Sequence, residues 1–311
     1  MRALVTAVGV YTAALPLAVL GEERRRLAER WLRGWIELTA LRRCDAAIVS
    51  YAKSGRTWLR VMLSRFYHTA HGMPPTEMLG FDNFKRRDAR LPAILFTHGN
   101  YLRDYTGDFA TRAPFYDRRV VLLVRDPRDI AVSQYFQWRY RMHPHKKWLN
   151  RYPDSGRELS IFDFVRDREI GLPAVVAWLA MWQREIERVS ERIVVHYEQM
   201  RANPADELGR ILDFLGTPAT PAQLADAVAY ASLENMRKLE EASAFKLAGA
   251  RLVPGERGNP ASYKTRRAKV GGFADYFDGG QLAELERLVA EHPPPLFGYA
   301  ARPAGAGNGA A

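Results

Sequence analysis

Cysteine is almost missing from this chain, since Cys44 is the single one among 311 residues. One thiol excludes an internal disulfide and any metal site that needs several cysteines. Spacing of histidines and acids typical of a metal site is not visible either, so we expect no bound metal. A reducing, cytoplasmic compartment is compatible with this composition.

Low-complexity linkers and internal repeats are also missing, and acidic residues are fewer than basic ones. We therefore expect one α/β domain over residues 44–301, with N-terminal helices over 1–43 and a disordered tail over 302–311. Lys and Arg number 46 against 35 Asp and Glu, which gives a net charge of +11. This excess favours a polyanionic ligand, nucleic acid or an anionic membrane surface, and composition does not separate the three.

Long uncharged runs are limited to the N-terminus. Residues Ala3–Leu20 carry no charge, and these 18 residues are at the lower limit for a membrane span. Gly21–Arg43 follows with seven Arg, four Glu and two Trp, which predicts a basic amphipathic helix. Two interpretations stay open: the helix packs on the domain, or it lies on a membrane surface, where Arg and Trp are favoured.

Apolar runs alternate with helical patterns through the rest of the chain. The runs typical of buried strands are Ala46–Ser50, Ala93–Thr97, Val120–Val124 and Ile193–His196. The helical patterns include Trp58–Ala70, Asp129–Gln137, Pro173–Val189 and a helix that begins at Pro204 and ends before Gly216. This alternation predicts a central parallel sheet flanked by helices on both faces. Ligands of such sheets bind at the carboxyl ends of the strands.

The stretch SYAKSGRTWLR, Ser50–Arg60, joins the first of these strands to a helix. Backbone N–H groups and the positive end of the helix dipole meet at such a junction, which suits a phosphate-like anion. The stretch is not a Walker A loop, because Lys53 precedes its only glycine, Gly55, and the aromatic Trp58 follows the threonine.

Two further basic clusters follow later in the chain. In VVLLVRDPRDIAVSQ, Arg125 ends a strand and Ser133 lies one turn into the next helix, where both can donate to a phosphate. The alternative is a loop ion pair between Arg125 and Asp126, with Ser133 as a packing residue. In YKTRRAKVGG, basic residues precede a glycine pair that lets a ligand approach closely, although such runs are usually solvated. These basic residues are Lys264, Arg266, Arg267 and Lys269.

Together and in this order, the three clusters resemble the family of sulfotransferases that use 3′-phosphoadenosine 5′-phosphosulfate. YAKSGRTW is similar to the family's YPKSGTTW loop, RDPxDxxxS to its RNPxDxxxS segment and RRAxxGxF to its RKGxxGxW segment. The resemblance covers residues 46–289. It implies a P-loop NTPase-like three-layer sandwich, with 3′-phosphoadenosine 5′-phosphosulfate as sulfuryl donor and no metal.

The resemblance also implies roles for individual residues. Those implied for the 5′-phosphate end of the donor are Lys53, Ser54, Gly55, Arg56, Thr57 and Trp58. Those implied for the 3′-phosphate are Arg125, Ser133, Arg266, Arg267 and Ala268. Those implied for the adenine, from segments similar to the family's YEDM and TSFxxM, are Tyr197, Ser232 and Leu233, again with Trp58. The departures from the family pattern are Ala52 for Pro, Arg56 for Thr, Ala268 for Gly and Phe273 for Trp.

The remaining role is that of the base. AILFTHGN, Ala93–Asn100, is similar to the family's KTHLP segment, whose His removes the proton of the acceptor, and this assigns the role to His98. A single His after a strand is also commonly structural. An unperturbed pKa of about 6.5 suits general base work at neutral pH. Lys53 is the second predicted catalytic residue, because it would offset charge on the leaving phosphate.

The predicted reaction is therefore in-line transfer of a sulfuryl group to a hydroxyl or amine, with His98 as the base. We expect Tyr67–Tyr116 and Trp138–Tyr152 to form the acceptor pocket, while lipid, glycan, peptide and small phenol or alcohol acceptors stay open. The alternatives are a P-loop-like nucleotide kinase and a non-catalytic basic module that binds membranes or nucleic acid. For the enzyme we expect no nucleic-acid partner, and residues 1–43 are the candidate for peripheral membrane contact. The oligomeric state is not predicted.

Overall fold

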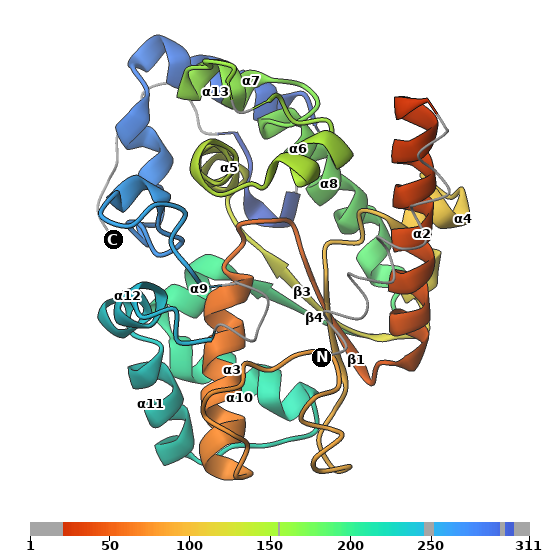
Figure 1. Ribbon diagram of the computed structural model, residues 1–311, viewed down its shortest axis with the longest axis vertical. Coiled ribbons are helices and arrows are strands. Elements are labelled where there is room, and N and C mark those ends of the chain that lie inside the picture. The colour runs from red at the N-terminus through yellow and green to blue at the C-terminus, as the bar shows by residue number, and fades with distance from the viewer. Residues whose placement is uncertain (1–20, 155, 246–251, 293–295, 302–311) are drawn as a thin grey trace.

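The computed structural model describes residues 21–154, 156–245, 252–292 and 296–301. The apolar segment 3–20 and the tail 302–311, for which predictions were made above, lie outside these residues. The strands are β1 (Ala46–Ser50), β2 (Ile94–Thr97), β3 (Arg119–Val124) and β4 (Glu191–His196). They form one parallel sheet in the order β2-β1-β3-β4 (Figure 1).

Both faces of the sheet are buried, because successive residues of a strand point to opposite sides. Along β1, Ala47 and Val49 join one hydrophobic cluster, whereas Ala46 and Ile48 join the other. A strand that is buried on both sides needs apolar residues at successive positions. The sequence predicts the strands from apolar runs of this kind. The predicted parallel α/β fold class is confirmed.

Helices cover the two faces (Figure 1). On the first face lie α3 (Arg56–Ala70), α9 (Tyr197–Ala202), α10 (Pro204–Phe214), α11 (Pro221–Tyr230) and α12 (Leu233–Glu241). On the second lie α2 (Glu22–Arg43), α4 (Leu102–Thr106), α5 (Pro127–Tyr140), α7 (Ile161–Arg166), α8 (Leu172–Glu185) and α13 (Gly279–Ala290). The other helices are α6 (Pro144–Leu149) and the short η2 (Ala113–Phe115), η3 (Ile186–Arg188), η5 (Pro260–Ser262), η6 (Gly272–Tyr276) and η7 (Leu296–Gly298).

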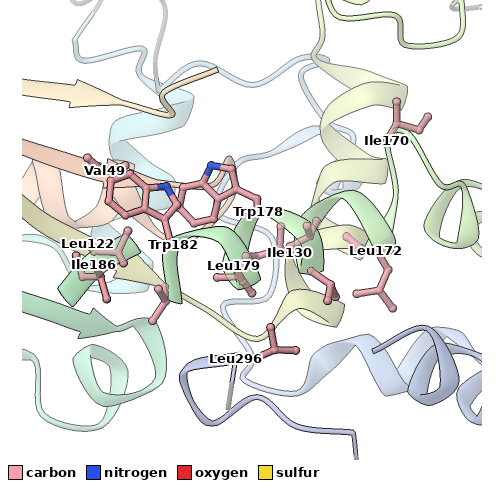
Figure 2. Close-up of a cluster of buried hydrophobic side chains, with 14 of the residues drawn as sticks. Val49, Leu122, Ile130, Ile170, Leu172, Trp178, Leu179, Trp182, Ile186 and Leu296 are labelled. Atoms are coloured by element: carbon pink, nitrogen blue, oxygen red, sulfur yellow. The ribbon is translucent and has the colours of Figure 1, made fainter. Parts of the chain in front are cut away.

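Helix α8 buries two tryptophans on the second face. The rings of Trp178 and Trp182 have centroids 5.9 Å apart, and they lie near Val49 of β1 and Leu122 of β3 (Figure 2). The indole N–H of Trp178 donates to the backbone carbonyl of His98 at 3.3 Å. The core thus continues without interruption to the end of β2, where the predicted base is found.

Helix α2 packs beside α4 at the edge of the molecule (Figure 1). Leu38 and Leu41 of α2 are buried in the core, so the helix does pack on the domain. Three apolar side chains of α2 stay exposed: Leu27, Trp31 and Trp35 keep 51%, 50% and 47% of their surface open. Within the described part of the chain, no helix combines the length and apolar character that crossing a membrane requires.

Candidate active site

A cavity of about 1610 Å³ opens at the carboxyl ends of the strands. Each strand places one predicted residue in its wall: Lys53 after β1, His98 after β2, Arg125 after β3 and Tyr197 after β4. Its lining includes these further predicted residues: Gly55, Arg56, Thr57, Trp58, Ser133, Leu233, Arg266, Arg267 and Ala268. Residues distant in the sequence thus meet at the sheet edge, as parallel topology requires.

Ser54 and Ser232 are the predicted residues that do not line this cavity. Ser54 is fully buried, and its hydroxyl has no hydrogen-bond partner among the described residues. Ser232 is the N-cap of α12, where its Oγ accepts from the backbone N–H of Asn235 at 3.3 Å. Local helix capping explains this serine, because the first N–H groups of a helix need such acceptors.

The loop between β1 and α3 is held in a tightly curved conformation. Lys53 has φ 75° and Gly55 has φ 91°, both in the left-handed region that favours glycine. A Cβ atom at Gly55 would lie 2.5 Å from the ring of Tyr197, so glycine is also needed for close approach. The ammonium group of Lys53 donates to Gln137 Oε1 at 3.4 Å. The loop therefore presents its lysine to the cavity from a strained backbone.

Positive charge gathers around Lys53. Burial, together with the nearby guanidinium groups of Arg141, Arg266 and Arg125, lowers the pKa of Lys53 to about 7. Burial and the neighbouring Lys53 and Arg141 likewise hold the pKa of Lys264 well below its ordinary value. The sequence places Lys264 in a basic run without giving it a role. A bound anion would relieve this repulsion, so the cavity is electrostatically suited to one.

Asp129 connects the second and third basic clusters. Its carboxylate accepts from Arg125 at 3.2 Å and from the backbone N–H groups of Gly271 and Phe273, both at 3.0 Å. Arg125 forms its ion pair with Asp129, and Asp126 pairs with Arg128 at 2.8 Å. Arg125 and the glycine-containing segment are thereby fixed in one place.

The third cluster continues this basic wall. The guanidinium of Arg266 lies over the ring of Phe136 at 3.6 Å and donates to the hydroxyl of Tyr276 at 2.8 Å. Arg267 is half exposed and pairs with Asp275 at 2.8 Å. Ala268 has φ 49°, the left-handed conformation that the glycine of the resembling family would adopt without strain. The turn is retained here at the cost of that strain.

Aromatic and apolar side chains also line the cavity, in addition to these cations. The indole N–H of Trp58 donates to the carbonyl of Ala231 at 2.8 Å, and its ring meets the edge of Tyr197 at 6.1 Å. Leu233 and Met236 of α12 complete the patch. Flat, apolar surfaces of this kind suit a planar ring such as a nucleobase.

His98 is neutral in this site. Its Nδ1 lies 2.6 Å from the carbonyl oxygen of Ser50, and its Nε2 lies 2.8 Å from Nη2 of Arg56. Burial first, and then the charge of Arg56, hold the pKa of His98 well below its ordinary value. An uncharged imidazole of this kind is chemically able to accept a proton at neutral pH.

Glu37 of α2 is a residue that sequence reasoning missed. Its carboxylate accepts from the hydroxyl of Thr97, and backbone N–H groups of Gly99 and Tyr101 also face it. Burial raises the pKa of Glu37 to about 7. An N-terminal helix therefore holds the loop that carries His98. The amphipathic pattern around Glu37 indicates a helix, but not the face that it turns to the domain.

The rest of the cavity lining combines predicted and unpredicted stretches. The predicted acceptor ranges supply residues such as Asn100, Phe109 and Tyr152. Helices α2 and α8, which were not expected there, add apolar side chains: Leu27, Ile36, Ala174, Ala177, Trp178 and Met181. Across the described part of the chain, no three His, Cys, Asp or Glu side chains gather as metal ligands would.

Comparisons with known proteins agree with this architecture. A family model described as "Sulfotransferase domain" matches residues 43–293. The chain is 23% identical to 3-beta-hydroxysteroid sulfotransferase of Cavia porcellus, over 81% of this chain and 86% of that protein. It is 26% identical to cytosolic sulfotransferase 16 of Arabidopsis thaliana, over 79% and 75%.

Solved structures share the fold. Mouse sulfotransferase SULT7A1 complexed with PAP superposes with a TM-score of 0.56 at 19% identity, over 85% of this chain and 94% of that one. Retinol dehydratase in complex with androsterone and inactive cofactor PAP gives 0.54 at 16% identity, over 80% of each chain. At these identities the likeness concerns the fold, whereas the family model covers most of the sequence. The chain therefore belongs to the sulfotransferase domain family.

Proposed function

We propose that this protein transfers a sulfuryl group from 3′-phosphoadenosine 5′-phosphosulfate to a hydroxyl or amine of an acceptor, with His98 as the base. The observation that carries the proposal is a single cavity that joins Lys53, the Arg125–Arg266 wall and His98. Similar folds bound to PAP, the donor without its sulfuryl group, support the choice of donor. No observation favours a nucleotide kinase or a non-catalytic module.

The residues present fit such a donor. The buried hydroxyl of Ser54 and the crowded ammonium of Lys53 are suited to its 5′-phosphosulfate end. Arg125 and Arg266 are suited to the 3′-phosphate, since guanidinium groups pair well with phosphate oxygens. Trp58 and Tyr197 offer their rings to the adenine.

When bound, the donor supplies the sulfuryl group and an oxygen on which negative charge develops during transfer. Lys53 offsets that charge from a fixed position. Electrostatic stabilisation of this kind is the largest single contribution to rate enhancement in many enzymes. His98 Nε2 accepts the proton of the acceptor hydroxyl or amine as the new bond forms. The cavity walls hold acceptor and donor in line, which lowers the entropic cost of bringing the reacting atoms together.

Turnover of labelled sulfate tests these roles. Lys53→Ala and His98→Ala should each lower the transfer rate by at least ~100-fold. His292→Ala is the matched control, because this histidine does not line the cavity. Near wild-type rates for His98→Ala would refute its assignment as the base.

The double variant Arg125→Ala with Arg266→Ala should weaken binding of adenosine 3′,5′-bisphosphate. Unchanged affinity in calorimetry would refute the second phosphate site.

To identify the acceptor class, transfer should be screened with lipid, glycan, peptide and small phenol or alcohol acceptors, with membranes present and absent.

We also propose peripheral membrane contact through α2 of an otherwise cytoplasmic enzyme. The exposed Leu27, Trp31 and Trp35 motivate it, and Leu27 also lines the cavity. Cosedimentation with anionic vesicles should be lost in the double variant Trp31→Glu with Trp35→Glu. Equal sedimentation of the wild-type protein and the double variant would exclude this contact.

A further inference from the structure

The contact between Arg56 and His98 fixes both nitrogens of the imidazole. A guanidinium can only donate hydrogen bonds, so Nε2 of His98, 2.8 Å from Arg56 Nη2, is the acceptor and carries no proton. A carbonyl can only accept, so Nδ1, 2.6 Å from the oxygen of Ser50, carries the proton. The lone pair that a base needs is thus present on Nε2, and Arg56 occupies it.

Arg56 belongs to the other half of the site. It is the first residue of α3, directly after the N-cap Gly55, in the loop that faces the 5′-phosphosulfate end of the donor. Its side chain therefore joins the anion-binding loop to the base across 42 residues of chain. Members of the resembling family have a threonine at this position. Its side chain is uncharged and too short to reach the imidazole.

The surroundings of Arg56 favour its release to an anion. Its charge is among the causes that lower the pKa values of Lys264 and of Lys146 on α6. The carboxyl group of Glu37 is an acidic neighbour, and burial raises its pKa to about 7. Arg56 donates a charge-assisted hydrogen bond to either partner, but a phosphate carries the opposite charge and can accept two parallel bonds from one guanidinium. A doubly charged anion in the loop therefore attracts Arg56 more than the neutral imidazole does.

We propose that Arg56 is a latch on the base: it holds Nε2 of His98 until the anion-binding loop is filled, and then turns to the anion. The proposal rests on the proposed function, since it takes His98 as the base. The acceptor hydroxyl needs Nε2 as its hydrogen-bond partner. Acceptor binding is consequently coupled to donor binding, so each ligand should raise the affinity for the other.

Nitrogen NMR of the full-length protein labelled at histidine tests the latch without turnover. The His98 signals are identified as those lost in His98→Gln. In the free wild-type protein, Nε2 should show the shift of a hydrogen-bonded acceptor, and adenosine 3′,5′-bisphosphate should move it toward the value of a free lone pair. In Arg56→Thr, the signal should already have that value without ligand. Arg65→Thr, also on α3, pairs with Asp226 outside the cavity and should behave as wild type.

Acylation by diethyl pyrocarbonate, read at His98 by mass spectrometry, is a second measurement in the free protein. The reagent attacks an unprotonated Nε2, so Arg56→Thr should react at least about tenfold faster than wild type or Arg56→Lys. Identical Nε2 signals and equal acylation in wild type and Arg56→Thr would overturn the latch. So would an Nε2 signal that the bisphosphate, once bound, leaves unchanged. Loss of turnover in His98→Ala alongside either result would leave the proposed function standing, so the two failures are distinguishable.

Discussion

The carboxylate of Asp129 accepts a hydrogen bond from the backbone N–H of Gly271 at 3.0 Å, across 142 residues of chain. It also holds Arg125, so one buried carboxylate positions both sides of the predicted 3′-phosphate site. Asp129→Asn keeps the shape and removes the charge. Because buried hydrogen bonds to charged groups contribute about 1.5–3 kcal/mol, affinity for adenosine 3′,5′-bisphosphate should fall by roughly 10–100-fold. Isothermal titration calorimetry measures it, and Asp226→Asn is a control outside the cavity.

Gly55 should tolerate no side chain. Gly55→Ala adds a methyl group 2.5 Å from the ring of Tyr197 at a residue with φ 91°. Gly72→Ala is the matched control, because Gly72 has φ 63° and open space around it. We expect Gly72→Ala to lose only the roughly 1–2 kcal/mol of left-handed strain in denaturant unfolding. Gly55→Ala should lose more and should also bind the bisphosphate more weakly. Equal behaviour of the two variants would contradict the close-approach argument.

Ala268→Gly should stabilise the protein. Ala268 has φ 49°, and the strain of a left-handed residue, roughly 1–2 kcal/mol, exceeds the roughly 0.5–1 kcal/mol entropic cost of glycine. The free energy of unfolding should rise by about 0.5–1 kcal/mol in the absence of ligand. Ala225→Gly in α11, an exposed helical site, should instead lower it by about 1 kcal/mol. A loss of stability at both sites would refute the strain assignment.

Binding of the bisphosphate should take up protons. The pKa of Lys53 is lowered to about 7, so this amine is largely neutral at pH 8 in the free protein, and burial and neighbouring cations also lower the pKa of Lys264. A nearby anion favours their charged forms and raises both pKa values. Affinity should therefore fall as pH rises from 7.5 to 9, where phosphate groups with a pKa of about 6 no longer titrate.

Calorimetry in buffers of different ionisation enthalpy counts these protons. Lys53→Met is the matched variant, since it keeps an unbranched side chain only one atom shorter and cannot take up a proton. It should show a smaller uptake than the wild-type protein at pH 8. Binding that releases protons, or an affinity that does not depend on pH over this range, would show that these amines do not respond to the anion.

The sequence predicted the strand-end residues well for a physical reason. An apolar run followed by Lys53, His98, Arg125 or Tyr197 places each side chain after a strand, and parallel strands bring those ends to one edge. Helix boundaries were less accurate: the helix predicted to reach Val189 ends at Glu185, and η3 follows. Terminal turns commonly tighten in this way, because hydrophobic periodicity does not distinguish the two helix types.

Contacts between side chains could not be predicted in the same way. The Arg56–His98 contact depends on the rotamers of two residues from different strand ends, and no local pattern encodes it. Glu37 reaches the loop of His98 because α2 packs beside α4, which is a tertiary outcome. Ser232 differs in another way, since similarity to a family segment predicts a ligand contact, whereas the structure gives this serine a local role as the N-cap of α12.

Helix α2 ends at Arg43, where the match to the family begins, and yet it supplies part of the cavity wall and holds the loop of His98. The residues proposed to bind the donor lie within the matched domain, whereas α2, which also lines the cavity, precedes it. The two can therefore diverge at different rates: an exchange of α2 between related enzymes would alter the choice of acceptor without disturbing the nucleotide site. We therefore expect the choice of acceptor to depend partly on α2.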